Sequence, residues 1–303
     1  VGPQDGATVE TLPRNADLAL YKSKDKGGNV VAAYVASLHA QAEERRVMEQ
    51  ELRGALERGE FELYYQPVVT AADGTLNGFE ALIRWNNKKL GNVSPGRFIP
   101  LAEDARLISP IGEWVLRTAC HEAMKWPSNL KVAINVSADQ LTDPRFASLV
   151  VSAPAQSGPS PQRREIEVTE SVFLRDGGGA AQLLDQLIGL GIRLSLDDFG
   201  TGYSSLGYLR KTQFSTIKVD RSFVVGAAKG SIESIAIIRA VVALADSLGM
   251  STTAEGAETE LEVETLRSFG CSNIQGYYYG RPMPASDVLT LFRRPDDVAT
   301  VAA

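Results

Sequence analysis

The chain has few of the residues from which the commonest protein sites are built. Its 303 residues include two cysteines, Cys120 and Cys271, and two histidines, His39 and His121. The cysteines have no CxxC spacing, so they make neither a disulfide framework nor a zinc site, and a reduced, cytoplasmic setting is expected. Two histidines argue against a histidine-rich metal site and a histidine-based triad. Any metal ion would therefore be held by oxygen ligands, which favours Mg²⁺, Mn²⁺ or Ca²⁺.

The sequence also lacks a membrane-spanning run and an excess of positive charge. No stretch of about 20 apolar residues is present, and the nearest candidate, residues 235–245, contains Arg239 and is predicted to be a buried helix. No secretion signal is visible, so this chain itself is not expected to contact a membrane. The net charge of −6 argues against a DNA or RNA polymer as partner. A content of 44% hydrophobic and 22% charged residues is typical of a globular protein with a sizeable core.

From residue 59 onward, short apolar runs alternate with helix-length amphipathic segments. The predicted strands are residues 61–69, 76–85, 131–136, 165–169, 192–197, 216–219, 250–254 and 273–275. The predicted helices between them include residues 111–125, 179–190, 231–248 and 258–269. Repeated strand–helix units predict an α/β fold, a TIM-like (β/α)8 barrel over residues 59–295. Residues 71–74 form a hairpin signal between the first two strands, so the barrel should have an antiparallel first strand.

The residues before the predicted barrel are polar and interrupted by proline and glycine. Residues 1–36 contain one amphipathic helix, at 16–24, which is too little to bury a core of its own. Residues 37–58 have a helical pattern and are predicted to be an N-terminal connector helix leading into the barrel. Both a solvated connector and a dimer-forming signalling helix fit this pattern. Residues 296–303 are expected to be a flexible tail.

The most informative residues are two adjacent acids, Asp197 and Asp198, at the end of an apolar strand. Neighbouring carboxylates repel each other and are costly to bury unless a cation lies between them. Polar residues also follow the other predicted strands, and the carboxyl ends of barrel strands converge on one rim. The residues in these positions are Glu80, Asn135, Glu167, Glu170, Asp197, Asp198, Lys218, Asp220, Glu255, Glu258 and Gln275. Such a set predicts a binuclear site for divalent ions, with Asp197 as the bridging ligand and Asp198 on one ion.

Each of these features also has a simpler explanation when taken alone. An isolated acid pair is compatible with a helix N-cap, Lys218 with a surface lysine and Gln275 with a turn. Residues 198–200 resemble the metal-binding triplet of protein kinases, but no HRD loop or glycine-rich nucleotide strand accompanies them. Residues 200–202 are not a dinucleotide fingerprint, because the third glycine is missing. The tyrosines at 277–279 fit either a base-stacking platform or packing in the core and rim.

Nine motifs in the same order resemble those of EAL domains, the cyclic di-GMP phosphodiesterase family. They are YQP (65–67), EALIRW (80–85), SPGRFIP (94–100), NVSADQL (135–141), EVTES (167–171), DDFGTGYSSL (197–206), IKVD (217–220), AEGAET (254–259) and QGYYYGRP (275–282). The few departures from the family pattern remove no polar group. Residues 16–24 with 27–29 also resemble the last helix and strand of a GGDEF (diguanylate cyclase) domain, without its signature loop.

The resemblance implies a role for each matching residue. The implied ligands of one metal ion are Glu80, Asn135, Glu167 and Asp197, and those of the second are Asp197, Asp198 and Glu255. The implied catalytic and supporting residues are Lys218 and Gln275, which would position the attacking water, Glu258 beside the second ion, and Glu170, which would brace the 197–206 loop. The implied substrate contacts are Arg84, on a phosphate, and Gln66, Leu82, Asp220 and Pro282 around the nucleotide.

As a member of this family, the chain would hydrolyse cyclic di-GMP to linear pGpG with two Mg²⁺ or Mn²⁺ ions, and Ca²⁺ would occupy the site as an inhibitor. The alternative on the same fold is a catalytically silent cyclic di-GMP receptor. Such receptors typically lose metal ligands or the acidic loop, both of which this sequence keeps. The family also implies a homodimer formed through the barrel. Residues 1–36 would be the remnant of a GGDEF domain, and the parent protein could carry a membrane anchor in segments outside this chain.

Overall fold

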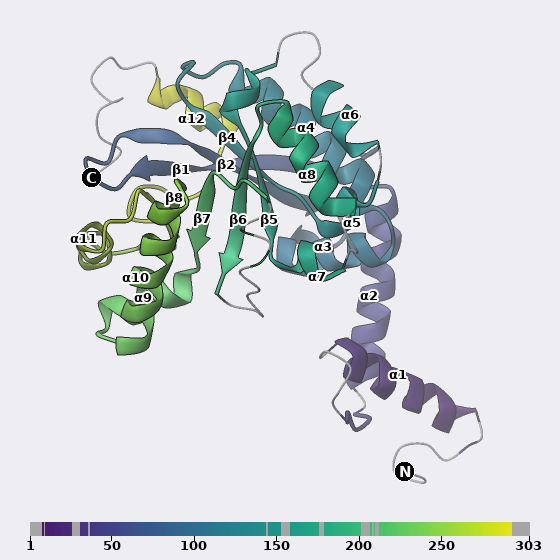
Figure 1. Ribbon diagram of the computed structural model, residues 1–303. Coiled ribbons are helices and arrows are strands. Elements are labelled where there is room, and N and C mark those ends of the chain that lie inside the picture. Colours follow the sequence, from purple (N-terminus) through teal and green to yellow (C-terminus); the bar gives the residue numbers. More distant parts are fainter. Residues whose placement is uncertain are drawn as a thin grey trace. The chain divides into compact units, whose positions relative to one another are not determined.

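The chain forms two compact units, one of Phe61–Trp85 with Arg106–Ala303 and one of Val1–Glu60 with Asn86–Ala105. The computed structural model (Figure 1) describes residues 8, 10–25, 31–35, 37–143, 145–152, 158–175, 179–200, 207, 209 and 212–292. Among these residues, no helix is both long and apolar enough to cross a bilayer.

Eight strands of the first unit close into a barrel. They are β1 (Phe61–Thr70), β2 (Leu76–Asn87), β4 (Lys131–Asn135), β5 (Arg164–Thr169), β6 (Arg193–Phe199), β7 (Thr216–Val219), β8 (Ser251–Glu255) and β9 (Asn273–Gln275). Hydrogen-bonded neighbours follow the order β1-β9-β8-β7-β6-β5-β4-β2, and the pairing of β1 with β2 closes the ring. A two-residue strand, β10 (Met283–Pro284), also pairs with β1. Every strand predicted from the sequence overlaps one of these eight.

The first strand differs from the others in direction. β1 is antiparallel to both of its neighbours, β2 and β9, whereas the remaining neighbours in the ring run parallel. The turn between β1 and β2 contains Gly74 at a φ of 75°, a conformation that glycine adopts without strain. The predicted TIM-like barrel with an antiparallel first strand is therefore confirmed.

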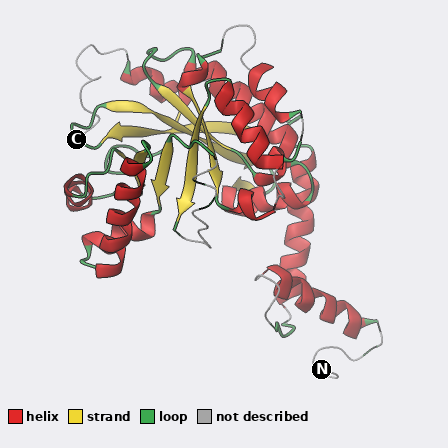
Figure 2. Cartoon of the chain, in the orientation of Figure 1, coloured by secondary structure: helices red, strands yellow, loops and turns green. Residues whose placement is uncertain are grey.

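Helices of the same unit lie outside the barrel strands (Figure 2). They are α4 (Ile108–Ala123), α5 (Ala138–Leu141), α6 (Phe146–Ser152), α7 (Ser171–Arg175), α8 (Gly179–Gly189), α9 (Arg221–Ala228), α10 (Ile232–Ser247), α11 (Glu260–Ser268) and α12 (Ala285–Leu291), with a 3-10 turn at Pro161–Arg163. The apolar run at 235–245 lies in α10, where Ile238, Val241 and Ala245 are buried, as predicted. The helices named from the sequence pattern did not include the shorter ones, α5, α6, α7, α9 and α12.

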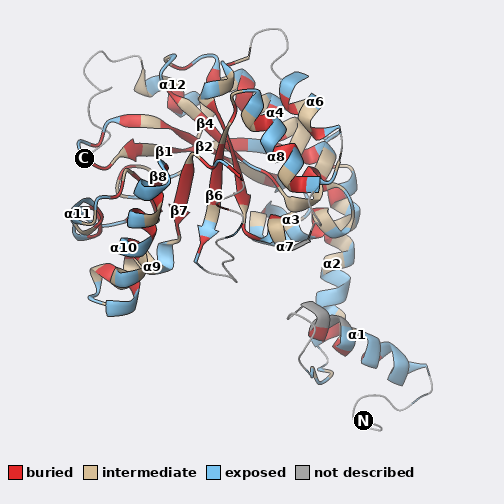
Figure 3. Cartoon of the chain, in the orientation of Figure 1, coloured by how far each residue is buried: buried red, intermediate tan, exposed pale blue. Residues whose placement is uncertain are grey.

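The barrel strands bury both of their faces (Figure 3). Alternate side chains of a strand point to opposite faces, and on β6 the apolar set includes Leu194 and Leu196, both fully buried. The intervening residue Ser195 is equally buried, and Glu167 on β5 and Lys218 on β7 are nearly so. The apolar set therefore packs toward the helices, and the barrel interior is lined by polar groups.

The second unit is built from helices and one short strand. Its elements are α1 (Thr11–Asp25), α2 (Ser37–Arg53), β3 (Gly91–Val93) and α3 (Pro95–Asp104). A hydrogen bond of 2.7 Å between His39 Nε2 and Asn15 Oδ1 joins α2 to α1. An ion pair of 2.5 Å between Arg97 and Glu44 joins α3 to α2. The helix predicted at 16–24 falls within α1.

The connector helix ends earlier than predicted. It was expected to reach residue 58, but α2 ends at Arg53 and residues 54–59 form turns. Arg58 folds back, and its Nη2 donates to the carbonyl oxygen of Glu51 at 2.5 Å. Gly54 allows this fold because a Cβ at that position would collide with the Arg58 guanidinium. The predicted tail at 296–303 lies outside the described residues.

Candidate active site

Polar residues from seven strands meet at one end of the barrel. β2, β4, β5, β6, β7, β8 and β9 run in the same direction, so their carboxyl ends share a rim. Five carboxylates on this rim, called the acidic cluster below, are Glu80, Glu167, Asp197, Asp198 and Glu255. The structure thus brings together side chains that are up to 175 residues apart in the sequence, as the difference between 80 and 255 shows.

Lys218 lies among four of these carboxylates and is only 2% exposed. Its Nζ is 2.6 Å from Glu255 and 2.9 Å from Glu167. The same atom is 3.3 Å from Asp197 and 3.8 Å from Glu80. A buried ammonium group is tolerated only when it is paired, and here four strands supply its partners. One lysine nevertheless balances only part of the charge of five carboxylates.

Two amides hold the Glu80 carboxylate in place. Asn135 Nδ2 donates to Oε1 at 2.6 Å, and Gln275 Nε2 donates to Oε2 at 2.5 Å. Gln275 Nε2 also lies 3.1 Å from Gln66 Oε1, on the strand that pairs with Glu80. Asn135 and Gln275 therefore orient a buried carboxylate, and Gln66 in turn accepts a hydrogen bond from Gln275.

A local irregularity in β6 brings Asp197 and Asp198 to the same place. In a regular strand their side chains would point to opposite faces. Here the register with β7 shifts between Leu196 and Phe199, and Asp198 has a φ of 53°. That left-handed conformation is unusual for a residue other than glycine, although aspartate tolerates it better than most. The backbone N–H of Asp198 donates to Asp197 Oδ1 at 2.9 Å.

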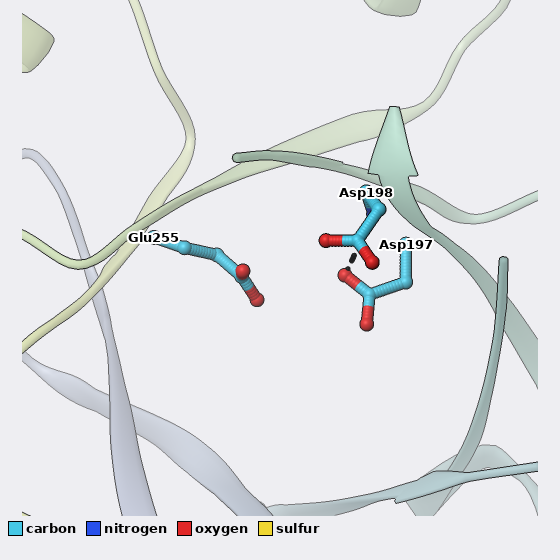
Figure 4. Close-up of side chains that lie close together, drawn as sticks. All are labelled: Asp197, Asp198 and Glu255. Carbon is cyan, nitrogen blue, oxygen red and sulfur yellow. Dashed lines mark hydrogen bonds between the residues drawn. The ribbon is translucent and has the colours of Figure 1, made fainter. Parts of the chain in front are cut away.

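The geometry of the rim fits a divalent cation. Asp197, Asp198 and Glu255 each offer a carboxylate oxygen, and these atoms lie within 4.8 Å of one another. Figure 4 shows Glu255 extending from its strand toward the aspartate pair. Glu255 and Asp197 are partly exposed, with 21% and 14% of their side-chain surface accessible. A hard oxygen-donor set of this kind suits Mg²⁺, Mn²⁺ or Ca²⁺.

Burial and crowding shift the pKa values of the site. Burial raises the pKa of Glu255 to about 7, against the opposing charge of Lys218. Burial likewise raises the pKa of Glu167 well above its ordinary value, and that of Asp198 less strongly. For Glu80, burial is outweighed by Lys218 and by the amide hydrogen bonds, so its pKa is lowered. Burial works against the charge of Lys218, but the surrounding carboxylates raise its pKa well above the ordinary value. The ionised forms of Glu167, Asp198 and Glu255 are therefore disfavoured at this site, and a bound cation would stabilise them.

Glu170 lies behind the aspartate pair. It is 7% exposed, and its Oε1 accepts a hydrogen bond of 3.2 Å from the backbone N–H of Gly200. Gly200 has a φ of 92°. The contact ties the end of β5 to the start of the 197–206 loop, of which residues 201–206 lie outside the described part of the chain.

A cavity of about 250 Å³ adjoins the acidic cluster. The predicted site residues that line it are Gln66, Glu80, Leu82, Asp197, Lys218, Glu255, Glu258 and Gln275. Three further residues line it that the sequence reasoning did not select, namely Arg221, Gly256 and Tyr277. Arg221 directly follows the predicted Asp220 at a strand end, so the strand-end rule could have found it. Of the tyrosines, Tyr277 is 43% exposed, while Tyr279 is buried and accepts a hydrogen bond from Arg267.

Arg84, Asp220 and Pro282 were also predicted as substrate contacts but do not line this cavity. The Arg84 guanidinium lies 5.2 Å from the centroid of the Tyr64 ring. Asp220 caps α9, since its Oδ1 accepts a hydrogen bond of 2.9 Å from Ser222 N. Pro282 is half-buried just before β10. Their roles in substrate binding remain predictions.

The sequence matches one protein family over most of its length. The family profile described as EAL domain matches residues 49–282. MucR of Pseudomonas aeruginosa, named a bifunctional diguanylate cyclase/cyclic di-GMP phosphodiesterase, is 42% identical over 291 residues, which cover 95% of this chain and 42% of MucR. NbdA of the same organism, named a cyclic di-GMP phosphodiesterase, is 39% identical over 286 residues, which cover 93% of this chain and 36% of NbdA. The chain thus spans less than half the length of these curated relatives.

A solved structure has the same fold. The PaMucR phosphodiesterase in complex with c-di-GMP superposes with a TM-score of 0.76 and 41% sequence identity. The match covers 80% of this chain and 99% of that one. The likeness supports the barrel described above at the level of both sequence and structure.

Proposed function

The chain belongs to the EAL domain family, and on that premise we propose that it is a metal-dependent phosphodiesterase that hydrolyses cyclic di-GMP to linear pGpG. The observation that carries the proposal is the acidic cluster, in which four carboxylates surround Lys218 and the fifth, that of Asp198, lies close to those of Asp197 and Glu255, beside a cavity. The printed activities of MucR and NbdA and the ligand of the PaMucR complex are consistent with it.

The proposed metal ligands divide into two sets. Glu80, Asn135, Glu167 and Asp197 would hold one divalent cation, and Asp197, Asp198 and Glu255 would hold a second. Mg²⁺ and Mn²⁺ are the proposed cofactors, and Ca²⁺ is the proposed inhibitor of the same site. When bound, such ions supply a water molecule of lowered pKa and neutralise charge that develops at phosphorus.

The protein side chains position the reacting groups. Lys218 and Gln275 orient the attacking water, and the Glu80 carboxylate is kept in place by the amide contacts of Asn135 and Gln275. The water loses a proton as its oxygen forms a bond to phosphorus. The bond from phosphorus to the 3′ oxygen breaks on the opposite side, and that oxygen takes up a proton to become a hydroxyl. One phosphodiester is then open and the product is linear pGpG. Glu170 supports the 197–206 loop through Gly200.

The test is direct hydrolysis. The purified chain is incubated with cyclic di-GMP in the presence of Mg²⁺, and pGpG is followed by chromatography. We expect pGpG to form, to stop after addition of a chelator and to resume when Mg²⁺ or Mn²⁺ is restored. Tight binding of cyclic di-GMP without product would reject the enzyme and favour the silent receptor.

Two further predictions concern the context of the barrel. We propose that two copies of the chain form a homodimer through the barrel, which light scattering at several protein concentrations would test.

We also propose that residues 1–36 are the end of a GGDEF domain. Of the segments that carry this second resemblance, residues 16–24 lie in α1, and residues 27–29 lie outside the described part of the chain.

A further inference from the structure

Arg221 is a cationic residue of the cavity to which no role has been assigned above. It is the first residue of α9 and lies three positions after Lys218. Its side chain lines the same cavity as Lys218, Asp197 and Glu255, and 53% of its surface is accessible. It therefore faces the space that the acidic cluster borders.

The loop that follows β8 holds Arg221 in this position. Gly256 has a φ of 72°, and a Cβ built on it would lie 2.7 Å from both Cβ and Cδ of Arg221, which is too close for any real side chain. Glycine at this position therefore lets the aliphatic stem of Arg221 lie across the loop. At the far end, Arg221 Nη2 is 2.9 Å from Glu258 Oε1.

The charges around the cavity leave Arg221 as the cation that can meet an incoming anion. Lys218 is 2% exposed and is already surrounded by four carboxylates. Among the described residues that line the cavity, Lys218 and Arg221 are the positively charged ones, against Glu80, Asp197, Glu255 and Glu258. Arg84 does not line it. An anionic substrate that enters this cavity therefore meets mainly carboxylates and one accessible guanidinium, that of Arg221.

We propose that Arg221 is a substrate-binding residue whose guanidinium exchanges Glu258 for a phosphodiester oxygen of the substrate. The identity of that phosphodiester rests on the proposed function. An exposed ion pair such as Arg221–Glu258 stabilises little, so leaving it costs little. The planar guanidinium matches the geometry of phosphate oxygens better than an ammonium group does. The stem, held across Gly256, keeps the guanidinium oriented before substrate arrives.

The experiment removes the positive charge of Arg221 and keeps the aliphatic part of its side chain. Arg221→Met retains methylene groups against Gly256 but has no guanidinium. The matched control is Arg117→Met on α4, because Arg117 is 49% exposed and pairs with Glu113 at 2.8 Å, much like Arg221 with Glu258, but lies away from the cavity. We expect KM for cyclic di-GMP to rise about tenfold in Arg221→Met, as for the loss of one charge-assisted contact. The value of kcat, the Mg²⁺ requirement and the melting temperature should stay close to wild type, and Arg221→Lys should restore part of the affinity.

Two results would overturn the inference. An unchanged KM would show that Arg221 does not touch substrate. A loss of kcat with a raised Mg²⁺ requirement and an unchanged KM would make Arg221 a support for the loop that carries Glu255. Turnover by the wild type tests the proposed function separately. If the wild type hydrolyses cyclic di-GMP and Arg221→Met has the same KM, the role of Arg221 is rejected while the proposed function stands. If the wild type binds cyclic di-GMP without hydrolysis, calorimetry decides instead: a tenfold weaker Kd in Arg221→Met supports the inference, and an equal Kd rejects it.

Discussion

The two ends of the barrel interior are both polar, but they differ in how their charges balance. At the amino end, Glu165 Oε2 lies 3.4 Å from Arg193 Nε, and Lys131 lines the same interior cavity as Glu165. Two asparagines there bond to each other, Asn77 Nδ2 donating to Asn273 Oδ1 at 2.9 Å. At the carboxyl end, the acidic cluster gathers five carboxylates and a single lysine, which contacts four of them. TIM barrels usually fill their interior with branched apolar side chains, so both ends are unusual.

This difference between the two ends distinguishes polar groups that stabilise the fold from polar groups that form a binding site. Buried polar groups that satisfy one another hold a fold in register without binding anything. A buried excess of one charge is unstable by itself, and it persists where a ligand of opposite charge completes it. The burial-raised pKa values of Glu167 and Glu255 record that instability at the carboxyl end. We infer that a buried excess of negative charge distinguishes the functional end of this barrel, since polar groups are common to both ends.

The largest predicted effect is that of Glu80→Ala, which should abolish turnover. The change removes a proposed metal ligand that two amides and Lys218 keep in place. The assay is pGpG formation at saturating Mg²⁺, together with the rise in melting temperature that Mg²⁺ gives the wild type by binding its folded state. If Glu80→Ala turned over at the wild-type rate, the catalytic ions would have to bind elsewhere. The carboxyl end of the barrel would then no longer be distinguished as the functional end.

The next effect is that of Lys218→Met, for which we expect turnover to fall on the order of 1,000-fold, within the range for lost groups that position or transfer protons. The variant also leaves four carboxylates without their buried partner, so the metal-free protein should melt at a lower temperature than wild type. Lys131→Met at the amino end is the matched control, and its turnover should stay near wild type. Comparable losses in both variants would mean that the two ends act as one unit.

The sequence predicts the features that arise from residues close together in the chain better than those that arise from contacts between distant residues. The barrel strands followed from apolar runs, and the polar residues of the rim followed because strand ends converge there. Gln66 and Leu82, which line the cavity, came from the family resemblance instead. The left-handed turn at Asp198 did not follow, because its register shift arises from pairing with a distant strand. The place of Arg221 depends on a glycine 35 residues later, as the difference between 221 and 256 shows. Such tertiary contacts leave no periodic signal.

A smaller effect is predicted for Glu170→Ala. It removes the acceptor for Gly200 N without removing a proposed ligand. Because groups that support ligands typically contribute 10- to 100-fold, turnover should fall by about that factor and the Mg²⁺ requirement should rise. Glu170→Gln keeps an oxygen acceptor and should recover most of the activity. If Glu170→Ala kept the turnover and Mg²⁺ requirement of wild type, the bracing role would be wrong.

The smallest effect should come from Glu165→Gln at the amino end, where we expect turnover and the Mg²⁺ requirement to stay within about twofold of wild type. The amide has nearly the same shape as the carboxylate and can still accept a hydrogen bond from Arg193, whose Nε is now 3.4 Å away. Because that hydrogen bond can remain, losing the charge should lower the free energy of unfolding by at most about 1 kcal/mol, the scale of a partly exposed ion pair. Parallel melting curves and pGpG assays would measure both quantities. A variant that folds like wild type but loses most of its turnover would show that charge at the amino end affects the acidic cluster. The excess of negative charge would then no longer separate the two ends.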